Sequence, residues 1–269
     1  MKTTALERIL IVGDSYGVPE LLTHIPVAQV VGIVCAAVRP QHHAALMQIA
    51  KFAGLPLLIQ PLKSAQDYPD FVAAIARLQP DSMLCHSYSM LIREDVLTLV
   101  SGRAINIHSA LLPRHRGPNP VQWALIHGDQ ETGVTMHVMD KGFDSGGILF
   151  QEKIVIEAND TWVTLSKKLR ESTQALLASA MPTVLSGEWH ICPQNESHAL
   201  SNSRICPDSL EIKFNNMSDL QIFNLIRAQV APLKGAYLRG LNETLRIPNL
   251  LTMAQISELR KIYESTHTS

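Results

Sequence analysis

The sequence lacks the long apolar run, of about 18 residues or more, that a helix needs to cross a bilayer. None of its four cysteines (Cys35, Cys85, Cys192 and Cys206) forms a CxxC pair, which argues against a zinc knuckle and a disulfide framework. Lys and Arg (23) balance Asp and Glu (24), and a net charge of −1 offers no global field for nucleic acid or anionic lipid. With no signal peptide ahead of the first apolar run, we expect a cytoplasmic protein without a bound metal, a nucleic-acid partner or a membrane contact.

The sequence does contain a regular alternation of short apolar segments with helical ones. At 269 residues and 46% hydrophobic residues, the chain can bury a full core without disulfide or metal staples. Short apolar runs predict strands at 9–12, 30–35, 57–59, 82–85 and 102–108, and helical stretches lie at 44–52, 71–78 and 93–100. Buried strands that alternate with helices are typical of a largely parallel sheet covered on both faces. The predicted fold class is therefore α/β, with a mostly parallel sheet plus a small C-terminal segment.

The second half of the chain predicts a change of organisation near residue 193. A helix at 120–127, strands at 133–139 and 147–156, and a long helix at 161–185 complete a main domain at 1–192. Residues 193–203 are polar and lack periodicity, which indicates a linker. The remaining 204–269 predict a small subdomain with a strand-like piece at 210–214 and helices at 218–229 and 253–263. About 65 residues are marginal as an independent domain, so we expect this subdomain to pack on the main domain or to form a homodimer surface.

The turn at 13–17 (Gly-Asp-Ser-Tyr-Gly) closes the first strand. It is neither a GxGxxG fingerprint nor a P-loop. It is interpreted first as a glycine turn at a strand end and second as a ligand-contacting loop, because open α/β sheets place their sites at this edge.

The window 105–146 carries the strongest chemical signal. Asn106 and His108 occupy positions i and i+2 of a predicted strand, so their side chains are expected on one face. Asp144 follows in a glycine-flanked loop and is the candidate partner that orients His108 and stabilises its charge. An isolated Asn-x-His pair is more often a hydrogen-bonded core pair, but the Pro-Arg-His-Arg-Gly segment that follows favours a site.

This window resembles the formyltransferase family that uses 10-formyltetrahydrofolate, which includes methionyl-tRNA formyltransferase, glycinamide ribonucleotide transformylase and the sugar N-formyltransferases. The family's Asn-x-His pair matches Asn106 and His108, and its loop aspartate matches Asp144. Its Ser-Leu-Leu-Pro-x-x-Arg-Gly segment matches 109–117, with Ala110 in place of the usual Leu or Ser, and Gly-Asp-x-x-Thr-Gly-Val-Thr matches 128–135. The resemblance extends more weakly over 9–187, and it implies a Rossmann-like formyltransferase catalytic domain at 1–192.

The resemblance implies transfer of a formyl group from a folate nitrogen to a neutral primary amine. Asn106 and His108 are then expected to donate hydrogen bonds to the oxyanion that forms on attack, which is usually the largest catalytic term. Asp144 is expected to hold the imidazole and to relay a proton from the amine to N10. Cys85 lies in a predicted strand without an adjacent base, so a covalent intermediate is not expected.

In the family, the pterin lies against backbone groups of two loops, which map here to 88–92 and 139–143. The expected folate contacts are Tyr88, Met90, Leu91, Ile92, Ser109, Leu111, Met139, Asp140 and Gly142. Filling of the core is an equally good interpretation of the Met90-Leu91-Ile92 run.

The choice of amine rests on the tail. Residues 201–269 carry 8 Lys and Arg against 6 Asp and Glu, and 38–44 has a single Arg, which argues against the many phosphate contacts of a tRNA. The tail is similar to that of sugar N-formyltransferases at 204–208, 224–228 and 232–237, although Lys213-Phe214 stands where the family commonly has Asp-Trp. We therefore expect a nucleotide-linked amino sugar made for surface polysaccharides. Its candidate contacts are Asn119, Gln122 and Trp123, with a place in the helix core favoured for Trp123.

Two alternatives remain open at this point. The first is a formyltransferase for another amine, such as an amino-acid side chain or methionyl-tRNA. The second is a non-catalytic folate-binding protein on the same fold, against which the presence of all three polar residues argues.

Overall fold

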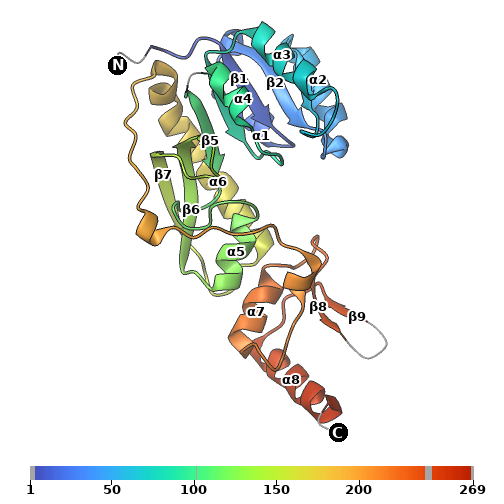
Figure 1. Ribbon diagram of the computed structural model, residues 1–269. Coiled ribbons are helices and arrows are strands. Elements are labelled where there is room, and N and C mark those ends of the chain that lie inside the picture. Colours follow the sequence, from blue (N-terminus) through green and yellow to red (C-terminus); the bar gives the residue numbers. More distant parts are fainter. Residues whose placement is uncertain (1–3, 101, 240–243, 268–269) are drawn as a thin grey trace. The chain divides into compact units, whose positions relative to one another are not determined.

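The computed structural model describes residues 4–100, 102–239 and 244–267 (Figure 1). Its main feature is a seven-stranded sheet with the order β3-β2-β1-β4-β5-β6-β7. The strands are β1 (Ile9–Gly13), β2 (Val30–Ala36), β3 (Leu57–Gln60), β4 (Ser82–His86), β5 (Ala104–His108), β6 (Glu131–Val138) and β7 (Ile148–Val155). Strands β1 to β5 pair in parallel and β6 runs antiparallel to β5, which confirms the predicted α/β fold with a mostly parallel sheet.

Apart from α1, which the sequence analysis did not predict, the helices lie at or near the predicted positions. They are α1 (Gly17–Leu22), α2 (His43–Ala53), α3 (Tyr68–Leu78), α4 (Glu94–Leu97), α5 (Pro120–His127), α6 (Trp162–Ser186), α7 (Asp219–Arg227) and α8 (Met253–His267). Among the described residues, no helix combines the length and the apolar character needed to cross a membrane. One sheet face carries Met83 and Cys85 into a core with Phe71 and Ile75 of α3. Residues Ile9 to Val12 of β1 are all 0% exposed, so both faces of the sheet are covered, and this explains why the strands are continuous apolar runs rather than alternating ones.

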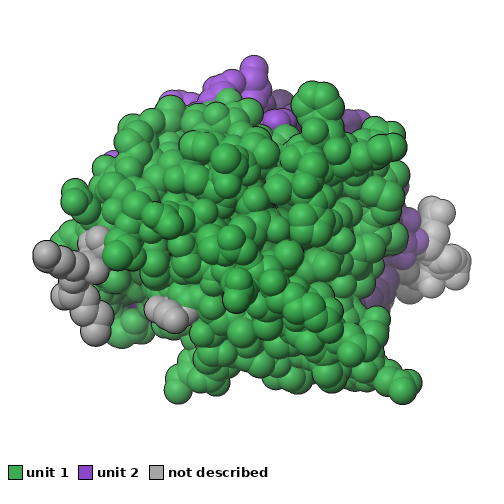
Figure 2. Space-filling view, turned by 90° about the horizontal axis from the view of Figure 1, so that it is seen from above, with its two compact units in different colours: residues 1–108, 134–152, 172–198 green, residues 109–133, 153–171, 199–269 purple. Residues whose placement is uncertain are grey.

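The chain divides into two compact units (Figure 2). The first comprises 1–108, 134–152 and 172–198, and the second comprises 109–133, 153–171 and 199–269. This division differs from the expected boundaries at 192 and 204, because part of the expected linker is bonded to the loop after β5. The Leu200 N–H donates to the Pro113 carbonyl (3.0 Å), and the Arg116 and Asn202 N–H groups bond across the same pair of segments (2.8 and 2.9 Å).

The second unit has its own small core and a feature that the sequence did not reveal. Ile222 and Ile226 of α7 pack with Ile256 of α8. A hairpin of β8 (Ala236–Arg239) and β9 (Thr244–Ile247) forms beside them. The strand expected at 210–214 is wrong: no strand forms there, and the segment joins β8 through an isolated bridge from Glu211 and a backbone bond from Ile212 N–H to the Tyr237 carbonyl (2.7 Å).

The turn after β1 is shaped by close packing against β4. A side chain at Gly13 would lie 2.5 Å from the His86 backbone oxygen, and one at Gly17 would collide with the same oxygen. The buried Asp14 carboxylate accepts from the Ala36 N–H (2.9 Å) and the Ser89 N–H (3.0 Å). Through these two bonds the turn is joined to the end of β2 and to the segment after β4, and the choice between a glycine turn and a ligand-contacting loop stays a prediction.

Candidate active site

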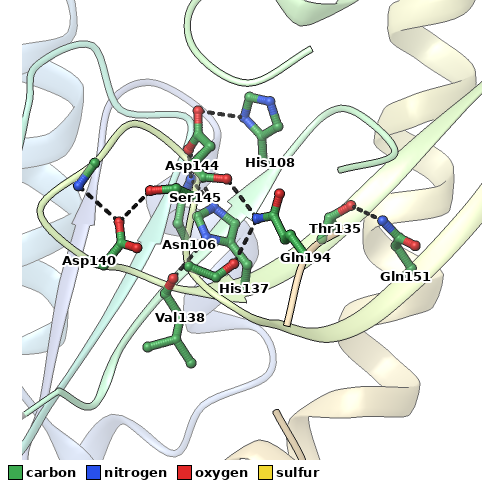
Figure 3. A network of polar contacts seen from close by, with 12 residues as sticks. Asn106, His108, Thr135, His137, Val138, Asp140, Asp144, Ser145, Gln151 and Gln194 are labelled. Atoms are coloured by element: carbon green, nitrogen blue, oxygen red, sulfur yellow. Dashed lines mark hydrogen bonds and ion pairs between the residues drawn. The ribbon is translucent and has the colours of Figure 1, made fainter. Parts of the chain in front are cut away.

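The pairing of β5 with β6 gathers four polar side chains on one face. Asn106 lies opposite His137, and His108 lies opposite Thr135. Side chains at positions i and i+2 of a strand share a face, as do residues paired across an antiparallel ladder. The candidate site therefore stands on two rigid strands rather than on loops alone (Figure 3).

The loop between β6 and β7 adds Asp144 to this group. Its Oδ2 lies 3.6 Å from His108 Nδ1, and its Oδ1 accepts a hydrogen bond from Asn106 Nδ2 (3.2 Å). The side chains of His108 and Asp144 are 9% and 16% exposed, so their electrostatic interaction is only partly screened by water. The structure thus brings Asn106, His108 and Asp144 together, as a shared site requires.

His137 is a fourth member that the sequence analysis did not select. Its Nδ1 lies 2.9 Å from the Val138 carbonyl, which only accepts, so Nδ1 carries a proton and donates it. Its Nε2 lies 3.2 Å from Asn106 Nδ2 and 3.3 Å from Asp144 Oδ1. The register between β5 and β6 is the feature that identifies His137, because a polar residue of β6 directly opposite Asn106 faces the same site.

The amide orientation of Asn106 follows from these neighbours. A carboxylate accepts hydrogen bonds only, so the Asn106 nitrogen and not its oxygen faces Asp144. The same Asn106 nitrogen lies 3.2 Å from His137 Nε2, so Asn106 and His137 both face the carboxylate of Asp144.

Cys85 is paired in register with Asn106 on β4, but it is not a nucleophile. Burial, followed by the negative charges of Asp144 and Asp14, raises the pKa of its thiol far above the usual range. A thiol that stays protonated at neutral pH is unreactive. The expectation that the chemistry proceeds without a covalent cysteine intermediate is thereby strengthened.

The loop after β4, expected to contact the pterin, is held by the buried side chain of Gln60 and the half-buried side chain of Tyr88. Tyr88 Oη donates to Gln60 Oε1 (2.8 Å), and Gln60 Nε2 donates to the Leu91 carbonyl (3.1 Å). Burial is the main cause that raises the pKa of Tyr88, so its hydroxyl remains a donor. Ile92 is 3% exposed in the core, whereas Leu91 is 37% exposed and Met90 is half-buried. Ile92 therefore fills the core, whereas Leu91 is accessible to a ligand.

The second expected pterin loop is braced from within. Asp140 Oδ1 accepts from the Gly142 N–H (2.9 Å) and from Ser145 Oγ (2.8 Å). Met139 packs against the core of the first unit. Asp140 therefore shapes the loop that presents Asp144, whatever contact its other oxygen makes.

The remaining expected contacts belong to the second unit. Ser109 and Leu111 are half-buried, as is Gln122. Asn119 Oδ1 accepts from the Ile205 N–H (3.1 Å), and Trp123 Nε1 donates to the Ser203 carbonyl (2.9 Å). Asn119 and Trp123 thus fasten the 203–205 segment to α5, and the structure gives Trp123 a packing role. Across the described residues, no group of three or more His, Cys, Asp or Glu side chains is arranged to hold a metal.

Comparison with solved structures shows which known proteins share this fold. A sugar N-formyltransferase from Shewanella sp FDAARGOS_354 is 20% identical over 91% of this chain and 98% of its own, with a TM-score of 0.75. A 4-N formyltransferase from Francisella tularensis is 18% identical over 91% and 98%, with a TM-score of 0.73. WlaRD, a sugar 3N-formyl transferase, is 20% identical over 83% of this chain and 79% of its own, with a TM-score of 0.65.

These structural similarities establish the fold. The family follows from the sequence, because the family model described as "Formyl transferase" matches residues 23–181, more than half of the chain. The matched stretch contains Asn106, His108, His137 and Asp144. The chain belongs to the formyl transferase family and is an enzyme of that class.

Proposed function

We propose that this enzyme moves a formyl group from 10-formyltetrahydrofolate to the primary amine of a nucleotide-linked amino sugar. The observation that carries the proposal is the convergence of Asn106, His108 and Asp144 at the C-terminal end of β5. These residues offer two kinds of hydrogen-bond donor and one proton acceptor around a single point, which is what acyl transfer to an amine requires.

Support for the amino sugar comes from the similar structures. The two with the highest TM-scores given above are a sugar N-formyltransferase and a 4-N formyltransferase, and each matches over nearly its whole length. WlaRD was crystallised in the presence of dTDP and 5-N-formyl-THF. A nucleotide-linked sugar and a folate donor are therefore the substrate pair we assign to this chain. A role in surface polysaccharide biosynthesis, a cytoplasmic location and a homodimer remain predictions from the sequence.

The described residues fit a folate donor. The loop 87–92 is fixed by Asp14 and Gln60, which bond Ser89 N–H and the Leu91 carbonyl, so its remaining backbone groups face a ligand in a preset geometry. The loop 139–143 is fixed by Asp140. When bound, 10-formyltetrahydrofolate supplies the formyl carbon on N10. Tyr88, Met90 and Leu91 from the first loop, and Met139 and Gly142 from the second, are the contacts we propose in the first unit.

Asn106, His108 and Asp144 divide the chemistry among them. As the amine nitrogen forms its bond to the formyl carbon, negative charge develops on the formyl oxygen. His108 and Asn106 donate hydrogen bonds to that oxygen, each worth roughly 3 kcal/mol in such sites. Asp144 accepts the proton that the amine loses, directly or through water, and returns it to N10 as the bond between N10 and carbon breaks.

The decisive experiment is a screen for products. Purified enzyme and 10-formyltetrahydrofolate are incubated with a library of nucleotide-activated amino sugars, and mass spectrometry looks for the gain of one formyl group. Release of tetrahydrofolate is followed optically in parallel. We expect formylation of at least one nucleotide amino sugar and none of methionyl-tRNA. Absence of turnover with every nucleotide amino sugar contradicts the proposed acceptor, whereas turnover with another amine retains the reaction and corrects the substrate.

A further inference from the structure

The loop that carries Asp144 needs support from outside itself. Asp144 has a φ of 52°, in the left-handed region that residues with a side chain rarely adopt, so the surroundings must hold it there. Gly146 follows in a tight passage, where any side chain would collide with the Val138 carbonyl. The Val138 N–H closes the loop by donating to the Gly147 carbonyl (2.9 Å). Neither contact constrains the peptide of Asp144 itself.

Gln194 supplies that constraint from a segment beyond α6. Its Nε2 donates to the Asp144 carbonyl (2.8 Å) and to the Gly146 carbonyl (2.7 Å), as Figure 3 shows. The segment is itself anchored, because Cys192 and Ile148 exchange two backbone hydrogen bonds of 2.8 and 2.9 Å. Gln194 is thus fixed relative to the start of β7 while it holds both sides of the turn around Ser145.

We propose that Gln194 is a positioning residue for Asp144, a role that rests on the proposed function of Asp144 in proton transfer. A primary amide offers two N–H donors on one nitrogen, which matches two carbonyl acceptors on either side of a turn. By holding these carbonyls, Gln194 sets where the Asp144 carboxylate stands relative to His108, whose Nδ1 is 3.6 Å away. The residue lies outside the 23–181 stretch that the family model matches, within the region where the sequence predicts only a linker.

Two substitutions of Gln194, with a control substitution of the next residue, test this role in the full-length enzyme. Gln194→Met keeps the size of the side chain but removes both donors, and Gln194→Lys restores N–H donors to the same carbonyls. Asn195→Ala is the matched control, since Asn195 Oδ1 accepts only local bonds from Ser197. Loss of such a supporting contact typically costs 10- to 100-fold in activity, because a carboxylate misplaced by about 1 Å is poorly aligned.

We expect Gln194→Met to lower kcat by about 10- to 100-fold while KM for both substrates changes by less than about threefold. Gln194→Lys should recover part of the loss, and Asn195→Ala should match the wild type. Hydrogen exchange read by mass spectrometry supplies an arm that needs no substrate: amides of 139–147 should exchange faster in Gln194→Met and at the wild-type rate in Asn195→Ala.

The outcomes separate the two ideas. Unchanged exchange in Gln194→Met, or faster exchange with wild-type kcat, overturns the positioning role. Equal losses in the Met and Lys variants, with a matching fall in Tm, also overturn it in favour of simple packing. A wild-type enzyme that formylates no amine contradicts the proposed function instead, and the exchange experiment still reports on the loop.

Discussion

The two units each contain a histidine–aspartate pair. The pairs differ in the distance between the two side chains and in how fully their hydrogen bonds are satisfied within the protein. In the second unit, His115 Nε2 donates to Asp129 Oδ2 at 2.7 Å, and Asn202 Nδ2 donates to His115 Nδ1 at 2.8 Å. Arg114 reaches both Asp129 oxygens, at 2.8 and 3.1 Å. In the first unit, His108 and Asp144 stand 3.6 Å apart, and Asp144 is shared with Asn106 and His137.

This difference separates a structural pair from a chemical one. A pair whose donors and acceptors are satisfied at short distance fixes the chain that carries it and gains nothing from a ligand. A longer pair with several alternative donors can rearrange when a substrate arrives, since catalytic hydrogen bonds often tighten only in the complex. The same two residue types therefore predict opposite consequences of substitution in the two places.

The largest effect is expected from His108→Ala. Removal of the imidazole eliminates one donor to the developing charge, and kcat should fall by about 10³-fold. The free energy of unfolding should change by less than about 1 kcal/mol, because the pair with Asp144 is long and adds little to folding. Steady-state kinetics and a urea titration check the two parts, and wild-type activity in the variant would refute the role given to His108.

His115→Ala should show the reverse pattern. Its loss removes the buried imidazole that bonds both Asp129 and Asn202 and leaves Asp129 with the half-exposed Arg114, so the free energy of unfolding should fall by about 2 kcal/mol. A chain of this size should then lose about 4–8 °C in Tm. Calorimetry measures the shift. A stability equal to that of His108→Ala would erase the distinction between the two pairs.

The pH dependence of stability sharpens the same contrast. Burial opposes ionisation of Asp129, but the hydrogen bonds from His115 and Arg114 outweigh it and lower the pKa of this carboxyl. Burial, with the electrostatic influence of His115 next, lowers the pKa of His127. Both shifts mean that the unfolded chain binds protons first, so stability falls as pH decreases, below about 6.5 for His127 and below about 4 for Asp129.

Asp129→Asn isolates the acidic part of this profile. The variant should lose stability less steeply than the wild type below pH of about 4, while the loss near pH 6.5 that comes from His127 persists. Urea titrations at several pH values measure both phases. Parallel curves for wild type and variant at acid pH would show that Asp129 is not held in its charged form by the second unit.

Trp123→Phe is expected to have the smallest effect. It removes the indole N–H that donates to the Ser203 carbonyl but keeps an aromatic ring beside His127. The free energy of unfolding should fall by about 1 kcal/mol. KM for the nucleotide sugar should change by less than about twofold, and a large rise in that KM would return Trp123 to the sugar contacts predicted from the sequence.

The sequence predicted the elements whose signal is local. The helix at 120–127 was placed correctly because Pro120 and Gly128 mark its two ends. The short helix α1 was missed, because Gly17 was assigned to the turn at 13–17 and no helix was predicted after it. The β8–β9 hairpin was missed because no local turn pattern marks it, and its existence depends on packing in the second unit.

The residues of the candidate site likewise differ in whether a local sequence pattern reveals them. Asn106 and His108 were found because a spacing of two residues is visible in one strand. His137 required the register between β5 and β6, which only the assembled sheet supplies. Gln194 lies 50 residues from Asp144 along the chain, in a stretch whose polarity suggests a linker, so nothing local connects the two.

The backbone pairing between Ile148 and Cys192 has a practical consequence for exchanging parts between related enzymes. Consider a hybrid that takes its N-terminal part from this chain and its C-terminal part from a related enzyme. The loop that carries Asp144 keeps its support from Gln194 only when the junction falls after residue 194. The matched family region ends at 181. A junction at that residue would cut through α6 and would replace Cys192, the backbone partner of Ile148.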